Sequence, residues 1–179
     1  LGAIFNCFDS MKKGLLYESQ FDKTRYKLVK FETILEDTET QLIELFKFLG
    51  LSSNHNLLST ENWLNEHGKK WHHNSAFLDK KKKIKYFDKK AAINRWENYL
   101  DEWEISFCEY INFKPMRKIG YESSEIKMDW DIVNSILLKD STIKKYFDKW
   151  KMKNEGVEEF PTDPLNPKNW TENMAPKIN

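Results

Sequence analysis

Lysines gather in one stretch of the sequence, where two of them could help to bind a phosphate group. Seven lysines fall between positions 80 and 90. The consecutive residues Lys80–Lys83 form either a solvated face, the usual role of such a run, or a flexible cationic flap over a polyanion. Lys89 and Lys90 directly precede Ala91–Trp96, which has the pattern of a helix start. Helix N-terminal amides and ammonium groups both attract anions, so this turn is a candidate phosphate site.

Three aromatic residues flank these lysines, namely Phe77, Phe87 and Trp96. Rings interleaved with cations suit a nucleotide, because a base can stack on a ring while the cations bind its phosphate. The alternative is an ordinary cluster in the hydrophobic core, which is the more frequent role of such a pattern. The residue types alone do not show whether these rings bind a nucleotide or belong to the hydrophobic core.

Histidines and cysteines are the residues most suited to metal binding, but their spacing does not favour it. His72 and His73 are adjacent, so they cannot both face one point on a regular element, and no HExxH pattern accompanies them. Cys7 and Cys108 lie about a hundred positions apart with no CxxC spacing. We therefore expect neither a metal site nor a disulfide, and we predict a reducing compartment, the cytoplasm.

Composition limits the class of protein further. The 179 residues suit one ordinary domain, and their 29 basic and 28 acidic side chains leave a net charge of +1. This balance argues against nucleic acid as the partner. No apolar run approaches the ~18 residues that a membrane span requires. The 7 Trp, 7 Tyr and 12 Phe supply enough apolar surface for a core.

In the first half of the chain, periodicity predicts two helices and a strand. The first helix covers residues 1 to about 17 and ends near Gly14 or soon after. The aromatic and branched run Tyr26–Phe31 predicts a strand. The second helix begins at Thr38, which pairs with Gln41 as a capping box, and it ends at Gly50. Its apolar stripe, expected to be buried, is Leu42, Leu45, Phe46 and Leu49.

Further along, the sequence predicts a short helix around 61–66 and three longer ones. One begins at Asp101, with Glu104 completing a capping box, and Pro115 stops it. The other two cover 129–138 and 141–153, and Gly156 stops the last. The last helix carries its apolar residues on one stripe, which consists of Ile143, Tyr146, Phe147 and Trp150.

Four segments resemble motifs of the sulfotransferase family and occur in the family's order across about half of the chain. The first segment runs from Tyr26 through Thr38 to Leu51. It is similar to the family's strand ending in Tyr-Glu-Asp and to the helix that follows, which closes in FLGL (Phe48–Leu51). His73–Phe77 is similar to the HNSSF segment, Lys89–Trp96 to Arg-Lys-Gly-x-x-Gly-(Asp/Arg)-Trp, and Met116–Tyr121 to the M-x-x-(L/I)-G-Y close of the domain.

The resemblance implies a co-substrate, 3′-phosphoadenylyl sulfate, and no metal. Two matching positions, Ser75 and Phe77, would hold the adenine. Three would bind the 3′-phosphate, namely Lys89, Lys90 and the amide of Ala91, and Phe87 matches an aromatic residue just before this loop. A compact dianion favours two cations and a backbone amide together. Trp96 matches a tryptophan that anchors this loop to the core.

The resemblance also implies the fold. The chain would be the C-terminal part of an α/β, P-loop-type sulfotransferase fold, predominantly helical with about one core strand. Residues 1–121 would form this half domain, 122–156 a helical extension and 157–179 a proline-rich tail. The family's phosphosulfate-binding loop, with its catalytic lysine, has no counterpart here, so no catalytic residue is assigned. The first residue is not methionine, and we expect a preceding N-terminal half or a partner chain to supply the transfer machinery.

The sequence therefore predicts a sulfotransferase fragment that moves a sulfuryl group from 3′-phosphoadenylyl sulfate to an acceptor hydroxyl or amine. The class of acceptor is not specified by any residue pattern. Two alternatives remain open. One is a non-catalytic binding or interaction module with a degenerate sulfotransferase fold. The other is a polyanion binder that uses Lys80–Lys90, which the near-zero net charge places last.

Overall fold

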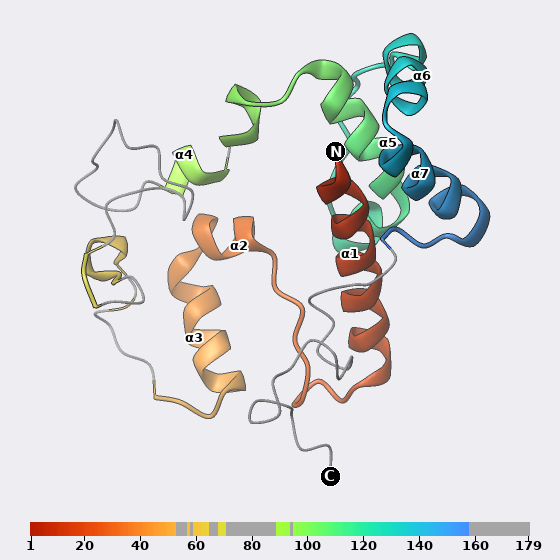
Figure 1. Ribbon diagram of the computed structural model, residues 1–179. Helices are drawn as coiled ribbons and strands as arrows, with labels where there is room; N and C mark the ends of the chain where they lie inside the picture. The colour runs from red at the N-terminus through yellow and green to blue at the C-terminus, as the bar shows by residue number, and fades with distance from the viewer. Residues whose placement is uncertain (53–56, 58, 65–67, 71–88, 94, 158–179) are drawn as a thin grey trace. The chain divides into compact units, whose positions relative to one another are not determined.

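The computed structural model describes residues 1–52, 57, 59–64, 68–70, 89–93 and 95–157 (Figure 1). Helices account for 69% of them. The described part of the chain divides into two compact units. The four-helix unit combines residues 1–26 with residues from 101 onward, and the middle unit comprises residues 27–100.

The predicted α/β fold is wrong. None of the described residues lies in a strand, and their only β-type pairing is an isolated bridge between Leu64 and Lys70. The core strand was predicted over residues 26–31, but residues 26–30 form no regular element, with Lys30 extended (φ −80°, ψ 133°), and Phe31 already begins a helix. Branched and aromatic residues favour an extended backbone, but a strand also needs a neighbour to complete its ladder. No described segment provides that neighbour.

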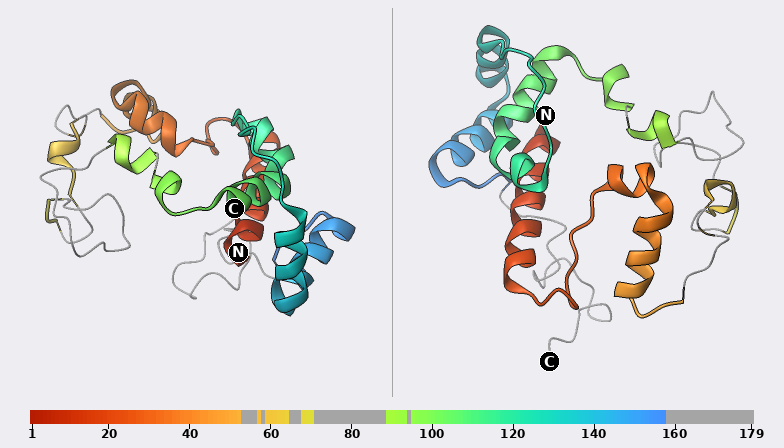
Figure 2. Two further views of the ribbon diagram at one scale, coloured as in Figure 1. Left: turned by 90° about the horizontal axis from the view of Figure 1, so that it is seen from above. Right: turned by 180° about the vertical axis from the view of Figure 1, so that it is seen from behind.

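The four-helix unit is built from α1 (Gly2–Gln20), α5 (Glu102–Ile119), α6 (Trp130–Lys139) and α7 (Ser141–Lys153). Helices α1 and α5 lie side by side, and α7 packs against α1 and α6 (Figures 1 and 2). Their facing sides bury one core, which consists of Phe5, Phe8, Phe107, Ile111, Val133 and Ile143. The predicted stripe of the last helix is confirmed, since Tyr146, Phe147 and Trp150 pack on this core beside Ile143.

The predicted capping box at Asp101 is confirmed, and two further helices begin at side-chain caps that were not predicted. The Asp101 capping box with Glu104 is present at the start of α5, where the Asp101 amide donates to the Glu104 carboxylate over 3.0 Å. Asp129 caps α6 by accepting from two backbone amides, and Asp140 caps α7 in the same way. Each cap satisfies amides that have no partner inside the helix, so these starts depend on nearby residues alone.

Two predicted helix ends are wrong, at Gly14 and Pro115. Helix α1 continues through Gly14 to Gln20, and α5 continues through Pro115 to Ile119. Glycine and proline inside a helix cost about 1 and 3 kcal/mol. Both residues are buried, and the packing of α1 and α5 against each other outweighs these costs. Helix α5 ends instead at Gly120, which adopts a left-handed conformation with φ 86°.

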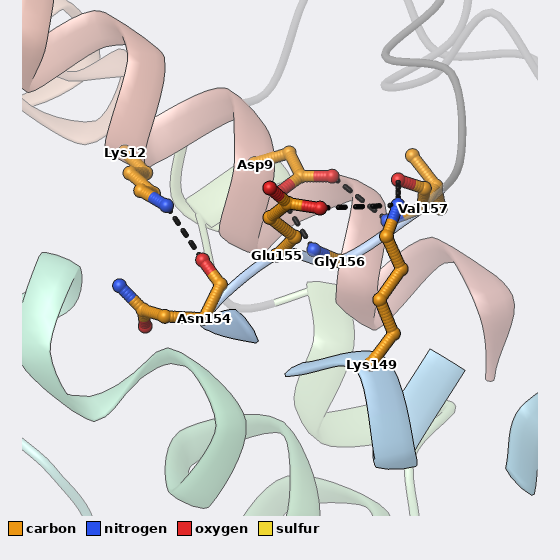
Figure 3. A network of polar contacts seen from close by, with 7 residues as sticks. All are labelled: Asp9, Lys12, Lys149, Asn154, Glu155, Gly156 and Val157. Carbon is orange, nitrogen blue, oxygen red and sulfur yellow. Dashed lines mark hydrogen bonds and ion pairs between the residues drawn. The ribbon is translucent and has the colours of Figure 1, made fainter. Parts of the chain in front are cut away.

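The chain after α7 is fastened to α1 by a set of polar contacts (Figure 3). The Asp9 carboxylate accepts hydrogen bonds from the amides of Gly156 and Val157, both at 2.8 Å. Lys12 donates to the Asn154 carbonyl, and Lys149 donates to the Val157 carbonyl over 2.7 Å. Helix α7 ends at left-handed Asn154 (φ 55°) rather than at Gly156, which is buried against α1.

The two cysteines are free thiols, one on α1 and one on α5. Burial raises the pKa of the Cys108 thiol from an ordinary 9.0 to about 11. The unfolded chain therefore releases this proton near pH 9, while the folded chain retains it up to about pH 11. The contribution of the neutral thiol to the free energy of unfolding is complete below pH 9 and is lost as the pH rises from 9 to about 11.

We predict that the unfolding free energy falls by about 2 kcal/mol more in the native protein than in Cys108→Ala between pH 8.5 and 11. Urea denaturation of both proteins across this range measures the difference. Because other titrating groups are present in both proteins, their effects largely cancel. Parallel pH curves would show that Cys108 ionises equally easily in the folded and unfolded chains.

Candidate functional site

The predicted phosphate-binding residues belong to the middle unit, which contains α2 (Phe31–Glu36), α3 (Thr38–Phe48), η2 (Thr60–Asn62), α4 (Lys89–Ile93) and η3 (Arg95–Asn98). Helix α2 packs against both α3 and α4. Leu35 on α2, only 2% exposed, is the one fully buried apolar side chain among the described residues of this unit. Helix α2 is therefore the element that joins the other two.

The helix predicted from Thr38 is confirmed, together with its stop. Gly50 is left-handed (φ 68°), and the Leu51 amide donates to the Phe46 carbonyl over 2.8 Å, closing the C-terminus. The predicted stripe, however, is incompletely buried. Leu42, Leu45 and Phe46 are half-buried and Leu49 is 54% exposed. No described element of the middle unit covers this face completely.

The predicted capping box between Thr38 and Gln41 is wrong. Asp37 (φ −125°, ψ 62°) separates α2 from α3 and occupies the position before the helix, so Thr38 is already its first residue. The Thr38 side chain is 4% exposed and its hydroxyl lies 3.3 Å from the Leu35 carbonyl of the preceding helix. The hydroxyl is thus turned inward, away from the amides of its own first turn.

Lys89 supplies a second partner of this buried hydroxyl, which itself donates to the Leu35 carbonyl. Its Nζ donates to Thr38 Oγ1 over 3.1 Å, across 51 positions of sequence. This contact holds the first turn of α4 at the α2–α3 junction. An ammonium group has three protons to donate, so the bond to Thr38 leaves Lys89 able to bind an anion as well.

Lys90, the second predicted cation, is exposed in the first turn of α4. The indole of Trp96 is 46% exposed, so the predicted role of this residue as an anchor to the core is wrong. Trp96 follows α4 in η3, where the Arg95 guanidinium lies 5.3 Å from the centre of the Tyr99 ring. The described residues after α4 thus present the aromatic side chains of Trp96 and Tyr99 to solvent, together with one basic and one acidic side chain, Arg95 and Glu97.

Several predicted residues fall outside the described residues. They are Ser75, Phe77, Phe87, the lysines between 80 and 85, and all four histidines. Ala91 lies within α4, and its side chain also falls outside the description. Within the described residues, no three histidine, cysteine, aspartate or glutamate side chains come together as a metal site. Lys89 and Lys90 are therefore the predicted site residues whose side chains can be placed.

No residue pattern indicated the role of Thr38 as the acceptor for Lys89. Its spacing to Gln41 predicts a local cap, whereas its partner Lys89 is 51 positions away in the chain. A cleft in the four-helix unit, described below, was also missed, because its lining comes from separate helices. Such arrangements depend on tertiary packing and produce no periodic pattern in the amino-acid sequence.

Comparisons with known proteins identify no relative. No protein-family model matches the chain, and no curated protein or solved structure shows significant similarity to it. In the described part of the chain, no helix combines the length and apolar character needed to cross a membrane.

Proposed function

We propose that this chain is part of a sulfotransferase and that its middle unit binds the 3′-phosphate of 3′-phosphoadenylyl sulfate through Lys89 and Lys90. An N-terminal half or a partner chain would supply the residues that transfer the sulfuryl group to the acceptor hydroxyl or amine. The two free thiols are in keeping with a reducing compartment, and we propose the cytoplasm.

The hydrogen bond between Lys89 and Thr38 is the observation that carries this proposal. Thr38 belongs to the first segment that resembles the sulfotransferase motifs, and Lys89 to the third. The hydrogen bond brings these two segments into contact across 51 positions of sequence. Their contact places adjacent cations at one end of α4, as binding of a phosphate monoester requires.

The predicted α/β fold lends no support to the proposal, because the described residues form no sheet. What the binding requires locally is a fixed cation, a second cation and a ring for the base. Lys89 is fixed by Thr38 and Lys90 is exposed beside it, while Phe77, the ring assigned to the base, lies outside the described residues. Sulfuryl transfer, like phosphoryl transfer, depends on positioning and on neutralising the charge of the leaving group.

The decisive experiment compares two nucleotides by isothermal titration calorimetry on the whole chain. Adenosine 3′,5′-bisphosphate is expected to bind more tightly than adenosine 5′-monophosphate, which lacks the 3′-phosphate. Lys90→Gln should weaken binding of the bisphosphate roughly fivefold and leave the monophosphate nearly unaffected. At 100 times its Kd, the bisphosphate should also stabilise the protein by roughly 2.7 kcal/mol.

Lys47→Gln is the matched control, because Lys47 is an exposed lysine of the same unit in the last turn of α3. It should leave both affinities unchanged. Equal binding of the two nucleotides, or equal effects of the two variants, would contradict the proposal. Binding of heparin that falls steeply with salt, without nucleotide binding, would favour the polyanion binder. Absence of all these signals would favour the non-catalytic module.

A further inference from the structure

The four-helix unit contains a cleft of about 730 Å³. Its lining comes from α5, from the connecting segment 121–129 and from α7, with Phe8 contributed by α1. Sites for small molecules typically have volumes of ~300–1,000 Å³. Every lining residue belongs to the four-helix unit, so this site is independent of the nucleotide site proposed above.

Aromatic rings form one wall of the cleft. The centres of the Tyr110 and Trp150 rings are 5.5 Å apart, and Trp150 meets Phe8 edge to face at 6.3 Å. Tyr110 also meets Trp130 edge to face at 5.1 Å. Each ring is supported by another, so the wall is held in place before a ligand arrives. A flat apolar molecule would find a complementary surface here.

The polar groups of the cleft differ in their availability. The Glu109 carboxylate accepts hydrogen bonds from the Ser124 amide and hydroxyl, both at 2.8 Å, and so fastens the connecting segment to α5. Lys114 of α5 and Lys151 of α7 are exposed and have no hydrogen bond or ion pair with any residue that the structure describes. The Glu109 oxygens are bonded to Ser124 but keep their negative charge, so the two free ammonium groups leave the cleft lining with one net positive charge.

We propose that this cleft binds a small amphipathic anion, with a flat aromatic body against the Tyr110–Trp150 wall and an acid group at Lys114 and Lys151. The aromatic wall supplies apolar contact, and the two cations on separate helices set the preference for negative charge. The ligand class is an aromatic carboxylate or sulfonate.

The test measures binding of naphthalene-2-sulfonate to the whole chain by calorimetry, with naphthalene-2-sulfonamide as its neutral counterpart. The sulfonate is expected to bind saturably, with a Kd below about 1 mM, and several times more tightly than the sulfonamide. Lys114→Gln and Lys151→Gln should each weaken sulfonate binding roughly twofold to fivefold while leaving the sulfonamide unaffected.

Lys118→Gln and Lys153→Gln are the matched controls, since both lysines are exposed on the same two helices but do not line the cleft. Ser123→Trp tests the location, because it places an indole on an exposed position of the lining and should abolish binding of both compounds. Equal affinity for the two compounds would overturn the proposed charge preference. Undiminished binding to Ser123→Trp, or no saturable binding at all, would overturn the site.

Discussion

Replacing Phe5 by alanine is expected to lower the free energy of unfolding of the four-helix unit by about 3–5 kcal/mol. Phe5 is completely buried, and its ring contacts those of Phe107 and Tyr146, with centres 6.2 and 5.8 Å away. These partners come from α5 and α7, so one side chain of α1 joins three helices. Its removal leaves a cavity that helices from different parts of the chain cannot easily close.

Phe113→Ala is the matched control for this experiment. It removes the same side chain from α5, but from a position that is 46% exposed, and it should cost less than about 1 kcal/mol. Urea denaturation followed by circular dichroism measures both changes, and hydrogen exchange of α1 and α5 peptides assigns them to this unit. Similar losses for Phe5→Ala and Phe113→Ala would show that the α1 core contact is not formed as described.

The second large effect is expected for Gly156→Ala, at about 3 kcal/mol of destabilisation. A Cβ atom at this position would lie 2.1 Å from the Phe5 carbonyl oxygen and 2.9 Å from a carboxylate oxygen of Asp9. The first atom belongs to the backbone of α1 and cannot turn aside. The segment after α7 must therefore move away, and its two hydrogen bonds to Asp9 weaken with it.

Gly2→Ala provides the comparison, because its new Cβ atom would meet only the Tyr146 side chain at 3.8 Å, an ordinary contact. This variant should change the unfolding free energy by less than about 0.5 kcal/mol. Thermal or urea unfolding of the two variants measures the contrast. If Gly156→Ala unfolds like the native protein, then the segment after α7 does not lie against α1.

The two units differ in how well they are packed, and this bears on function. The four-helix unit buries six large apolar side chains in one core, whereas Leu35 alone is fully buried among the described residues of the middle unit. The hydrogen bond between Lys89 and Thr38 therefore contributes a larger share of the stability of the middle unit than a single hydrogen bond contributes in the four-helix unit. We expect bound nucleotide to slow hydrogen exchange in α2 and α4 more than in α1 and α5.

The amino-acid sequence by itself determined the helices whose start signals are local. Asp101 with Glu104, Asp129 and Asp140 each bind amides within three residues, and the predicted range 141–153 agrees with α7. Gly50 likewise ended its helix as expected, since a left-handed conformation depends on the backbone of one residue. These features need no partner from elsewhere in the chain.

Only the tertiary structure decided the remaining features, because each depends on a distant partner. Gly14 and Pro115 remain helical owing to the packing between α1 and α5, and residues 26–30 form no strand because no described neighbour pairs with them. The Lys89–Thr38 contact and the aromatic cleft also join segments far apart in sequence. Residue spacing determines which side chains lie on one face of a helix, whereas the packing of the helices determines which of those side chains come into contact.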